Sequence, residues 1–292
     1  AGIAVVKFDM PEGDPYLVRA RSAGRNPIDS VFRVAMKGLA SVRRKVENGK
    51  FNEIKAKRRM EHLGELYLGH LRYGTHAGHS KSNCHPYVRR NNVPSRNLAI
   101  AGNFNMTNSR ELFEKLVEFG LHPVGDSDTQ VILEKIGYSL DLEHDHLRAT
   151  MGPGSLRSLD GTQLAEAISE DIDLGRVLKK AARHWDGGYV FGGLVGNGDA
   201  FICRDPAGIR PAFYYVDDEV LAVASERAAL VTVFDVKPED VKAVTPGHVL
   251  TIKRSGEISE ESFVDPLPLR QCTFERIYFS RGNDKAIYGE RK

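Results

Sequence analysis

The sequence lacks several features that would assign a protein class at once. No apolar run approaches the roughly 20 residues that a membrane-spanning helix needs. The first residues, "AGIAVVKFDMPEG", show no basic region followed by a long apolar stretch, the pattern of a secretory leader. We therefore expect a soluble protein with no membrane partner.

Charge of one sign and cysteine are scarce as well. Lys and Arg number 41 against 39 Asp and Glu, so the formal net charge of +2 gives no field that would hold a nucleic acid. The three cysteines, Cys84, Cys203 and Cys272, are odd in number and far apart, which is poor material for a disulfide framework. These features predict a cytoplasmic protein without a nucleic-acid partner.

Apolar residues make up 41% of the 292 residues, enough for a sizeable core, and their patterns come in blocks. The first half predicts strands at 3–8, 16–21 and 98–101, helices at 27–45, 109–119 and 128–140, and a long loop at 143–161. The second half predicts hairpins at Asn197-Gly198, Asp217-Asp218 and Ser255-Gly256. Blocks instead of strict alternation favour an α+β fold over a doubly wound parallel sheet.

The stretch "LAIAGNFNMTNSREL", residues 98–112, places several small amides between a buried strand and a helix. Asn108 and Glu111 have the spacing of a capping box, which predicts strand, polar turn and helix. An Asn amide and a neighbouring backbone N–H aimed at one point would form an oxyanion hole for acyl transfer. Turn and cap chemistry alone also explains these residues.

The segment "HLRYGTHAGHSKSNCHPY" contains the metal-ligand types His76, His79, Cys84 and His85, but their spacing matches no common zinc pattern. We favour a polar loop over a metal site. Arg72, at the end of a predicted strand, is well placed to clamp a carboxylate, with a surface salt bridge as the alternative.

Two further turns carry charged residues. In "GDSDTQVILEKIG", Ser127 can cap a helix whose first turn holds Asp128, a carboxylate that could also accept from a substrate ammonium. In "CRDPAGIRPAFYY", Asp205 and Arg210 lie at a tight turn that either binds a phosphate or is locked by them, and we favour the structural role.

The order of these segments resembles one family, the class II glutamine amidotransferases. "GHLRYGT" is similar to that family's Gly-His-x-Arg-Tyr-Ser-Thr and "GNFNMTN" to its His-Asn-Gly-Asn-Leu-Thr-Asn, and the resemblance runs on through "RDPAGIRP", "ASERAAL" and "CTFERIYFSRG". It implies an N-terminal-nucleophile hydrolase fold: a four-layer αββα sandwich of two antiparallel sheets. It also implies a cysteine thiol at the N-terminus that attacks glutamine, with its own α-amino group as the base.

Carried over to this sequence, the resemblance assigns four residues to the site. Arg72 looks like the clamp on the glutamine α-carboxylate, and Asp128 looks like the acceptor for its α-ammonium. Asn103 would be the side-chain donor of the oxyanion hole and Phe104 its backbone N–H donor. Phe104 replaces the family's Gly, so the hole requires Phe104 to adopt a backbone geometry that Gly takes freely.

The family's nucleophilic Cys is absent from the chain, which begins Ala1-Gly2-Ile3. Either Ala1 replaces the nucleophile, or these residues match the family's later Arg-Gly-x-x-x-Ala-Gly-Ile segment. We favour the second interpretation, in which residues 1–270 are the glutaminase domain without its first strand and helix. Residues 271–292 would then begin the link to a phosphoribosyltransferase domain.

The resemblance is strongest to the family members that transfer ammonia to phosphoribosyl pyrophosphate, which gives 5-phosphoribosylamine in purine biosynthesis. It implies glutamine as substrate, a phosphoribosyltransferase domain as partner and a homo-oligomer. It also implies that Mg binds with phosphoribosyl pyrophosphate in that other domain, and that Tyr278 and Arg281 lie near the passage of ammonia between the two sites. Some relatives carry an iron–sulfur cluster whose first ligand aligns near Cys272, and we do not expect a cluster here. The alternatives are a synthase of the glucosamine-6-phosphate type and a non-catalytic glutamine-binding module.

Overall fold

The computed structural model describes residues 1–72, 80–151 and 159–278, leaving out the side chains of residues 276 and 278. Their main elements, in chain order, are β1 (Gly2–Val6), β2 (Leu17–Arg21), α1 (Pro27–Ala35), α2 (Leu39–Glu47), α3 (Glu53–Arg59), β3 (Leu66–His70), β4 (Tyr87–Arg89), β5 (Leu98–Met106), α4 (Ser109–Glu118), α5 (Asp128–Thr150), α7 (Gly161–Asp171), α8 (Leu174–Ala181), β6 (Gly187–Val195), β7 (Ala200–Arg204), β8 (Phe213–Val216), β9 (Leu221–Ala224), α9 (Arg227–Phe234), β10 (Lys242–Ala243), β11 (His248–Ile252), β12 (Ile258–Ser262) and α10 (Thr273–Tyr278). Short 3₁₀ turns occupy Lys81–Asn83, Pro94–Arg96 and Pro238–Asp240.

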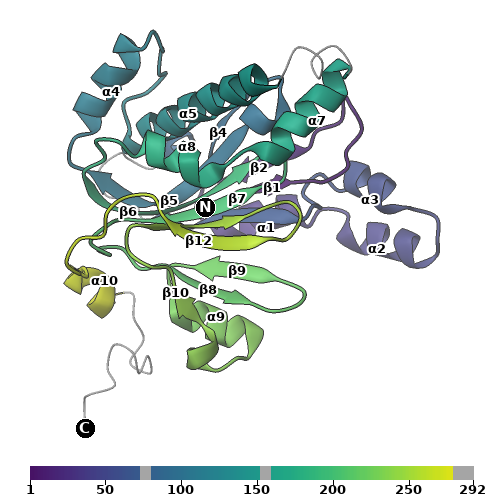
Figure 1. Cartoon of the computed structure of the whole chain (residues 1–292). Helices are drawn as coiled ribbons and strands as arrows, with labels where there is room; N and C mark the ends of the chain where they lie inside the picture. Colours follow the sequence, from purple (N-terminus) through teal and green to yellow (C-terminus); the bar gives the residue numbers. More distant parts are fainter. Residues whose placement is uncertain (73–79, 152–158, 279–292) are drawn as a thin grey trace.

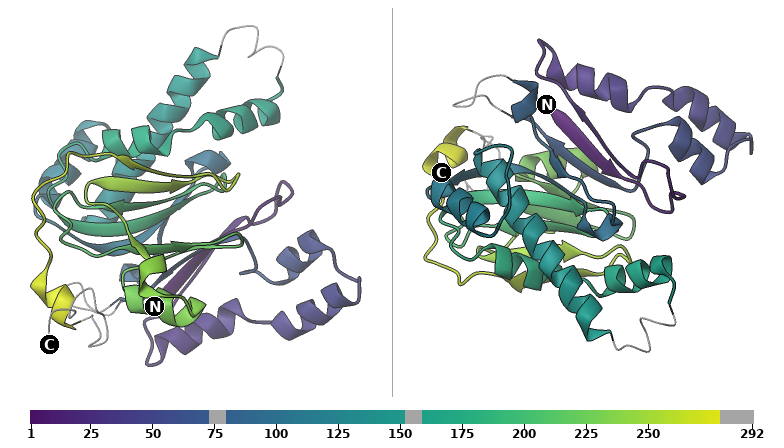
Figure 2. Two further views of the ribbon diagram at one scale, coloured as in Figure 1. Left: turned by 60° about the horizontal axis from the view of Figure 1, so that its bottom comes forward. Right: turned by 90° about the horizontal axis from the view of Figure 1, so that it is seen from above.

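Two antiparallel sheets form the centre of the molecule (Figure 1). One has six strands in the order β12-β11-β7-β6-β5-β4, and the other has three in the order β2-β1-β3. Helices α5 and α8 cover the outer face of the larger sheet, while α1 packs against β1 and β2 of the smaller one (Figure 2). The layers are therefore helix, sheet, sheet, helix, in agreement with the predicted α+β sandwich.

Each layer boundary has its own apolar core. Ile132 and Ile136 of α5 and Leu178 of α8 are fully buried against Ile100 and Phe191 of the six-stranded sheet. Between the two sheets the core consists of smaller side chains, Ala4 and Val6 of β1 with Ala99 and Leu194 of the larger sheet. Small residues let the two sheets approach each other closely.

The three predicted hairpins are confirmed. β6 and β7 pair around Asn197-Gly198, β8 and β9 around Asp217-Asp218, and β11 and β12 around Ser255-Gly256. Gly198 has φ +100° and Gly256 φ +90°, the left-handed backbone that such turns require. Strands β8 and β9 belong to a small third sheet, β10-β8-β9, which α9 covers.

Three predicted boundaries are wrong. The helix expected at 27–45 is split into α1 and α2 because Gly38 takes φ +88° between them. The loop expected at 143–161 begins too early, since α5 continues to Thr150 and buries Glu143 and His144.

No helix in the described part of the chain is long and apolar enough to cross a membrane.

The third error concerns the polar turn expected after residue 101. Strand β5 continues to Met106, and the pair Asn103–Val190 lies within its uninterrupted ladder with β6. Along this stretch Asn103 and Asn105 are exposed, Phe104 is half-buried and Met106 is buried, the alternation of a strand with one solvated face. Helix α4 does follow, but the Asn108 side chain donates to the His184 carbonyl instead of capping it.

Candidate active site

The predicted oxyanion residues lie on a free edge of strand β5. Strand β4 pairs with β5 only as far as Tyr87–Ile100. Beyond that point the even-numbered N–H groups of β5 point away from β6: Gly102 donates to His85 Nδ1 at 3.2 Å and Met106 donates to Asp128 Oδ2 at 2.8 Å.

Phe104 N–H lies between those two donors on the same edge, because N–H groups of a strand alternate in direction. No hydrogen-bond acceptor for it is found within the described ranges 1–72, 80–151 and 159–278. Phe104 is not among the described residues with positive φ. Replacing the family's Gly by Phe therefore causes no backbone strain here, and the N–H remains available to a ligand.

Asp128 approaches this edge from helix α5. Ser127 caps the helix, its Oγ accepting from Gln130 N at 3.3 Å, as predicted. Asp128 is the first helical residue, and its bond to Met106 N fixes the carboxylate two residues along the strand from Phe104, a spacing of roughly 7 Å. The helix N-terminus also favours a negative charge at this position.

Arg72 lies just beyond the end of β3 and is half-buried. Its Nη1 donates to the Asn83 carbonyl at 3.1 Å, which ties the guanidinium to the segment that precedes His85. Arg72 is also close enough to His70 and His85 for its charge to lower both pKa values. The alternative of a surface salt bridge has no support, because Arg72 forms no ion pair among the described residues.

His85 connects these parts, although the sequence suggested it only as a weak zinc ligand. Its ring is buried, accepts from Gly102 N, contacts Thr129 Oγ1 through Nε2 at 3.2 Å and stacks on His70 with centroids 4.3 Å apart. Because Nδ1 accepts a backbone N–H, His85 is neutral and Nε2 carries the proton. Burial lowers the pKa of His85 to about 2 and that of His70 to about 4.

Asn103 points its amide toward the C-terminal helix α10. Its Nδ2 donates to Glu275 Oε1 at 2.7 Å, and the same carboxylate oxygen pairs with Arg210. Glu275 is 9% exposed and therefore depends on both partners. No local pattern identifies Glu275 as a partner of Asn103, because the contact joins residues 172 positions apart.

Asp205 locks the turn that carries Arg210, as the structural interpretation predicted. The fully buried carboxylate accepts from the backbone N–H of Ala207, Ile209 and Arg210 at 2.9–3.1 Å. The backbone of residues 267–272 then runs along this turn and donates to it. The turn thus supports α10.

The three cysteines lie in different surroundings, and two of them are buried. Cys203 is fully buried in β7, and burial raises its pKa, which makes it unreactive. Cys84 is buried and donates to the carbonyls of Ser22 and Ser80. Cys272 is half-buried before α10, and its proposed relation to an iron–sulfur cluster stays a prediction.

Some predicted residues fall outside the description. His76, His79 and Arg281 lie outside the described residues, as does the side chain of Tyr278. Across the part of the chain that is described, no group of three or more His, Cys, Asp and Glu could hold a metal ion. The expected Mg, which the resemblance assigns to a phosphoribosyltransferase domain, stays a prediction.

The chain is similar in sequence to amidophosphoribosyltransferases from bacteria and archaea. It is 27% identical to the Methanocaldococcus jannaschii protein over 246 residues, which cover 79% of this chain and 45% of that one. It is 30% identical to the Synechocystis protein over 241 residues (79% and 41%) and 28% identical to the Escherichia coli protein over 248 residues (80% and 42%). The chain is related to the amidophosphoribosyltransferases.

Solved structures agree with this relationship in fold. Glutamine phosphoribosylpyrophosphate amidotransferase from B. subtilis, complexed with ADP and GMP, superposes with a TM-score of 0.60 at 22% identity, covering 96% of this chain and 46% of that one. A structure of "the allosteric regulatory enzyme of purine biosynthesis" gives 0.62 at 24% identity with the same coverage. The chain therefore shares its fold, two stacked antiparallel sheets between helical layers, with these two enzymes. No protein-family model matches the chain.

The chain spans less than half the length of the curated amidophosphoribosyltransferases that it matches. The relationship covers about four-fifths of the chain and includes the strands and helices that carry Arg72, Asn103 and Asp128. The activity of the complete relatives, which extend well beyond the matched region, is applied to this chain only as a proposal.

Proposed function

We propose that this chain is the glutamine-hydrolysing part of an amidophosphoribosyltransferase. The observation that carries the proposal is the free edge of β5, where Phe104 N–H lies unpaired between His85 and Asp128. A backbone donor with no acceptor among the described residues, next to a fixed carboxylate, suits a ligand that brings both an oxyanion and an ammonium group.

In the proposed complex, Arg72 holds the α-carboxylate of glutamine and Asp128 accepts from its α-ammonium. The side-chain carbonyl of glutamine then lies between Asn103 Nδ2 and Phe104 N–H. Attack of a thiolate on this carbon moves an electron pair onto the oxygen, and the two donors stabilise that charge. The nucleophile's α-amine takes the thiol proton as the thiolate forms and gives it to the amide nitrogen as the C–N bond breaks, so the intermediate collapses to a thioester and ammonia. Water then cleaves the thioester to glutamate and free thiol.

The complete protein would pass this ammonia to phosphoribosyl pyrophosphate and form 5-phosphoribosylamine, in the manner that the names of the related proteins indicate. Partnership with a phosphoribosyltransferase domain, Mg bound with that substrate and a homo-oligomeric state belong to this proposal. The names of the relatives favour it over a synthase of the glucosamine-6-phosphate type. A non-catalytic glutamine-binding module remains the alternative for the 292 residues alone.

The test compares glutamate release by the complete gene product and by this chain. We expect the complete product to release glutamate and its Asn103→Ala variant to lose roughly 10²–10³-fold in kcat with little change in KM, as for a single oxyanion donor. Ammonia-dependent synthesis should be retained in the variant, which shows that it is folded. Glutamate release that is indifferent to Asn103 would exclude the proposed oxyanion hole, and activity of the 292-residue chain alone would mean that a different group attacks.

A further inference from the structure

A cavity lies in the outer helical layer of the six-stranded sheet, where helices α4, α5 and α8 meet. The cavity has a volume of about 360 Å³, within the range of small-molecule sites. Its lining includes Lys115 of α4, Lys135 of α5, and Lys180 and Arg183 of α8 and the residues after it, with Glu118 as a carboxylate. Three separate elements thus bring cations to one place.

Lys135 is the unusual member of this group because it is only 8% exposed. Neither Lys135 nor Lys180 nor Arg183 forms an ion pair with any residue in the described ranges. Burial lowers the pKa of Lys135, and the nearby charge of Lys115 lowers it further. No carboxylate of the described chain pairs with Lys135, so an anion that enters the cavity meets an ammonium with no competing partner.

Lys115 is already paired with Glu111 at 3.0 Å, so the free charges at the cavity are those of Lys135, Lys180 and Arg183. Phe119 and Tyr138 stack on each other at 5.3 Å and form an aromatic wall of the cavity. Concave walls with low polarity concentrate the field of such charges on the cavity instead of spreading it over the surface. The arrangement suits a small, multiply charged anion better than a long polyanion.

We propose that the cavity between α4, α5 and α8 binds a small phosphate-type anion, with Lys135 at its base and Lys180 and Arg183 at its rim. This site is separate from the β5 edge and does not rest on the proposed function. The ligand bridges three helices, so its binding stabilises the outer helical layer against the sheet.

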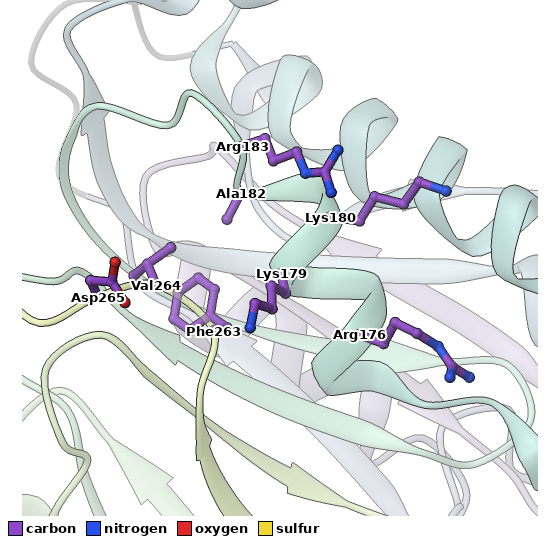
Figure 3. A pocket seen from close by; sticks show the side chains of 8 residues that line it. All are labelled: Arg176, Lys179, Lys180, Ala182, Arg183, Phe263, Val264 and Asp265. Atoms are coloured by element: carbon purple, nitrogen blue, oxygen red, sulfur yellow. The ribbon is translucent and has the colours of Figure 1, made fainter.

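Helix α8 supplies a matched control. Figure 3 shows a neighbouring cavity of about 520 Å³ on the same helix, where Lys179 points toward Phe263 and away from Lys180. Lys180 and Arg183 line both cavities, whereas Lys135 lines only the proposed site and the exposed Lys179 only the neighbouring cavity. Replacing Lys179 therefore changes the net charge of the same helix as much as replacing Lys180 does, without removing a cation from the proposed site.

The experiment is calorimetric titration of the 292-residue chain with inorganic pyrophosphate, against sodium chloride at equal ionic strength. We expect saturable binding with one site, weakened roughly tenfold or more in Lys180→Met and in Lys135→Met, and changed less than twofold in Lys179→Met. Pyrophosphate should also raise the Tm of the unmodified chain and of Lys179→Met but not of Lys180→Met. Lys180 is exposed, so its variant serves even if Lys135→Met fails to fold.

Two results would overturn the proposal. The first is the absence of saturable binding beyond the effect of chloride. The second is equal weakening in Lys179→Met and Lys180→Met, which would mean that pyrophosphate responds to the general charge of α8 and not to this cavity.

Discussion

At the scale of single residues, the site depends on groups whose partners come from other elements. Arg72 is anchored to Asn83, Asp128 to Met106 and Asn103 to Glu275. Each side chain is therefore oriented before any ligand binds, which reduces the cost of ordering it on binding.

Removal of the Arg72 guanidinium tests the carboxylate clamp. In the complete enzyme, Arg72→Ala should raise the KM for glutamine roughly tenfold or more, because a charge-assisted contact to the α-carboxylate is lost. Ammonia-dependent synthesis should be spared, since ammonia has no carboxylate. Parallel steady-state assays with glutamine and with ammonia decide the matter, and an equal loss of both activities would contradict the role.

The paired histidines predict a dependence of stability on pH. Both folded pKa values lie below 6.5, so the unfolded chain binds protons first as the pH falls. The contribution of these neutral histidines to the free energy of unfolding is therefore complete above about pH 6.5. It declines toward pH 4, by up to about 1.4 kcal/mol per pH unit for each histidine. Other buried histidines, His62 and His144, act in the same direction.

Urea unfolding at pH 6 and pH 4.5 measures this decline, with His85→Gln as the variant. Glutamine keeps an acceptor for Gly102 N and a donor toward Thr129 but cannot be protonated. The stability of His85→Gln should fall less between the two pH values than that of the unmodified chain. An identical fall would show that His85 is not among the groups that titrate on unfolding.

At the scale of elements, much of the fold follows from local patterns. Two hairpins follow from Gly198 and Gly256, which take the left-handed backbone of their turns, and the start of α5 follows from Ser127 at its cap. The extension of β5 through Asn103 and Asn105 was missed because exposed amides on a strand look like a turn until the pairing with β6 is known. His85 and Glu275 were beyond local prediction, since both act through contacts that only the tertiary fold creates.

The turn between β7 and β8 gives a prediction for an element. Asp205→Ala should cost at least about 3 kcal/mol of unfolding free energy, because three buried N–H groups would lose their acceptor. Asp217→Ala is the control: its carboxylate accepts from Glu219 N and Val220 N in a similar turn, but it is exposed and water can replace it. Urea unfolding of both variants should show a loss for Asp217→Ala below about 1 kcal/mol. Equal losses would mean that burial of the Asp205 turn is not what makes it costly to break.

At the scale of the whole molecule, α10 connects the end of the described chain to the candidate site. Glu275 joins Asn103 of the six-stranded sheet to Arg210 of the Asp205 turn. A carboxylate can only accept, so it forces the amide of Asn103 to present Nδ2 and not Oδ1. One of the two N–H bonds of that nitrogen is then held by Glu275, and the other is free for the proposed oxyanion.

This connection predicts that Glu275 positions Asn103 without contacting glutamine. In the complete enzyme, Glu275→Ala should lower kcat with glutamine roughly tenfold or more, because the amide loses its fixed orientation, while KM for glutamine changes little. Glu275→Gln should restore most of the activity, since its Oε1 still accepts from Asn103. Ammonia-dependent synthesis measured beside both variants separates this role from a general disturbance of α10, because loss of packing would reduce both activities and would not be rescued by Gln.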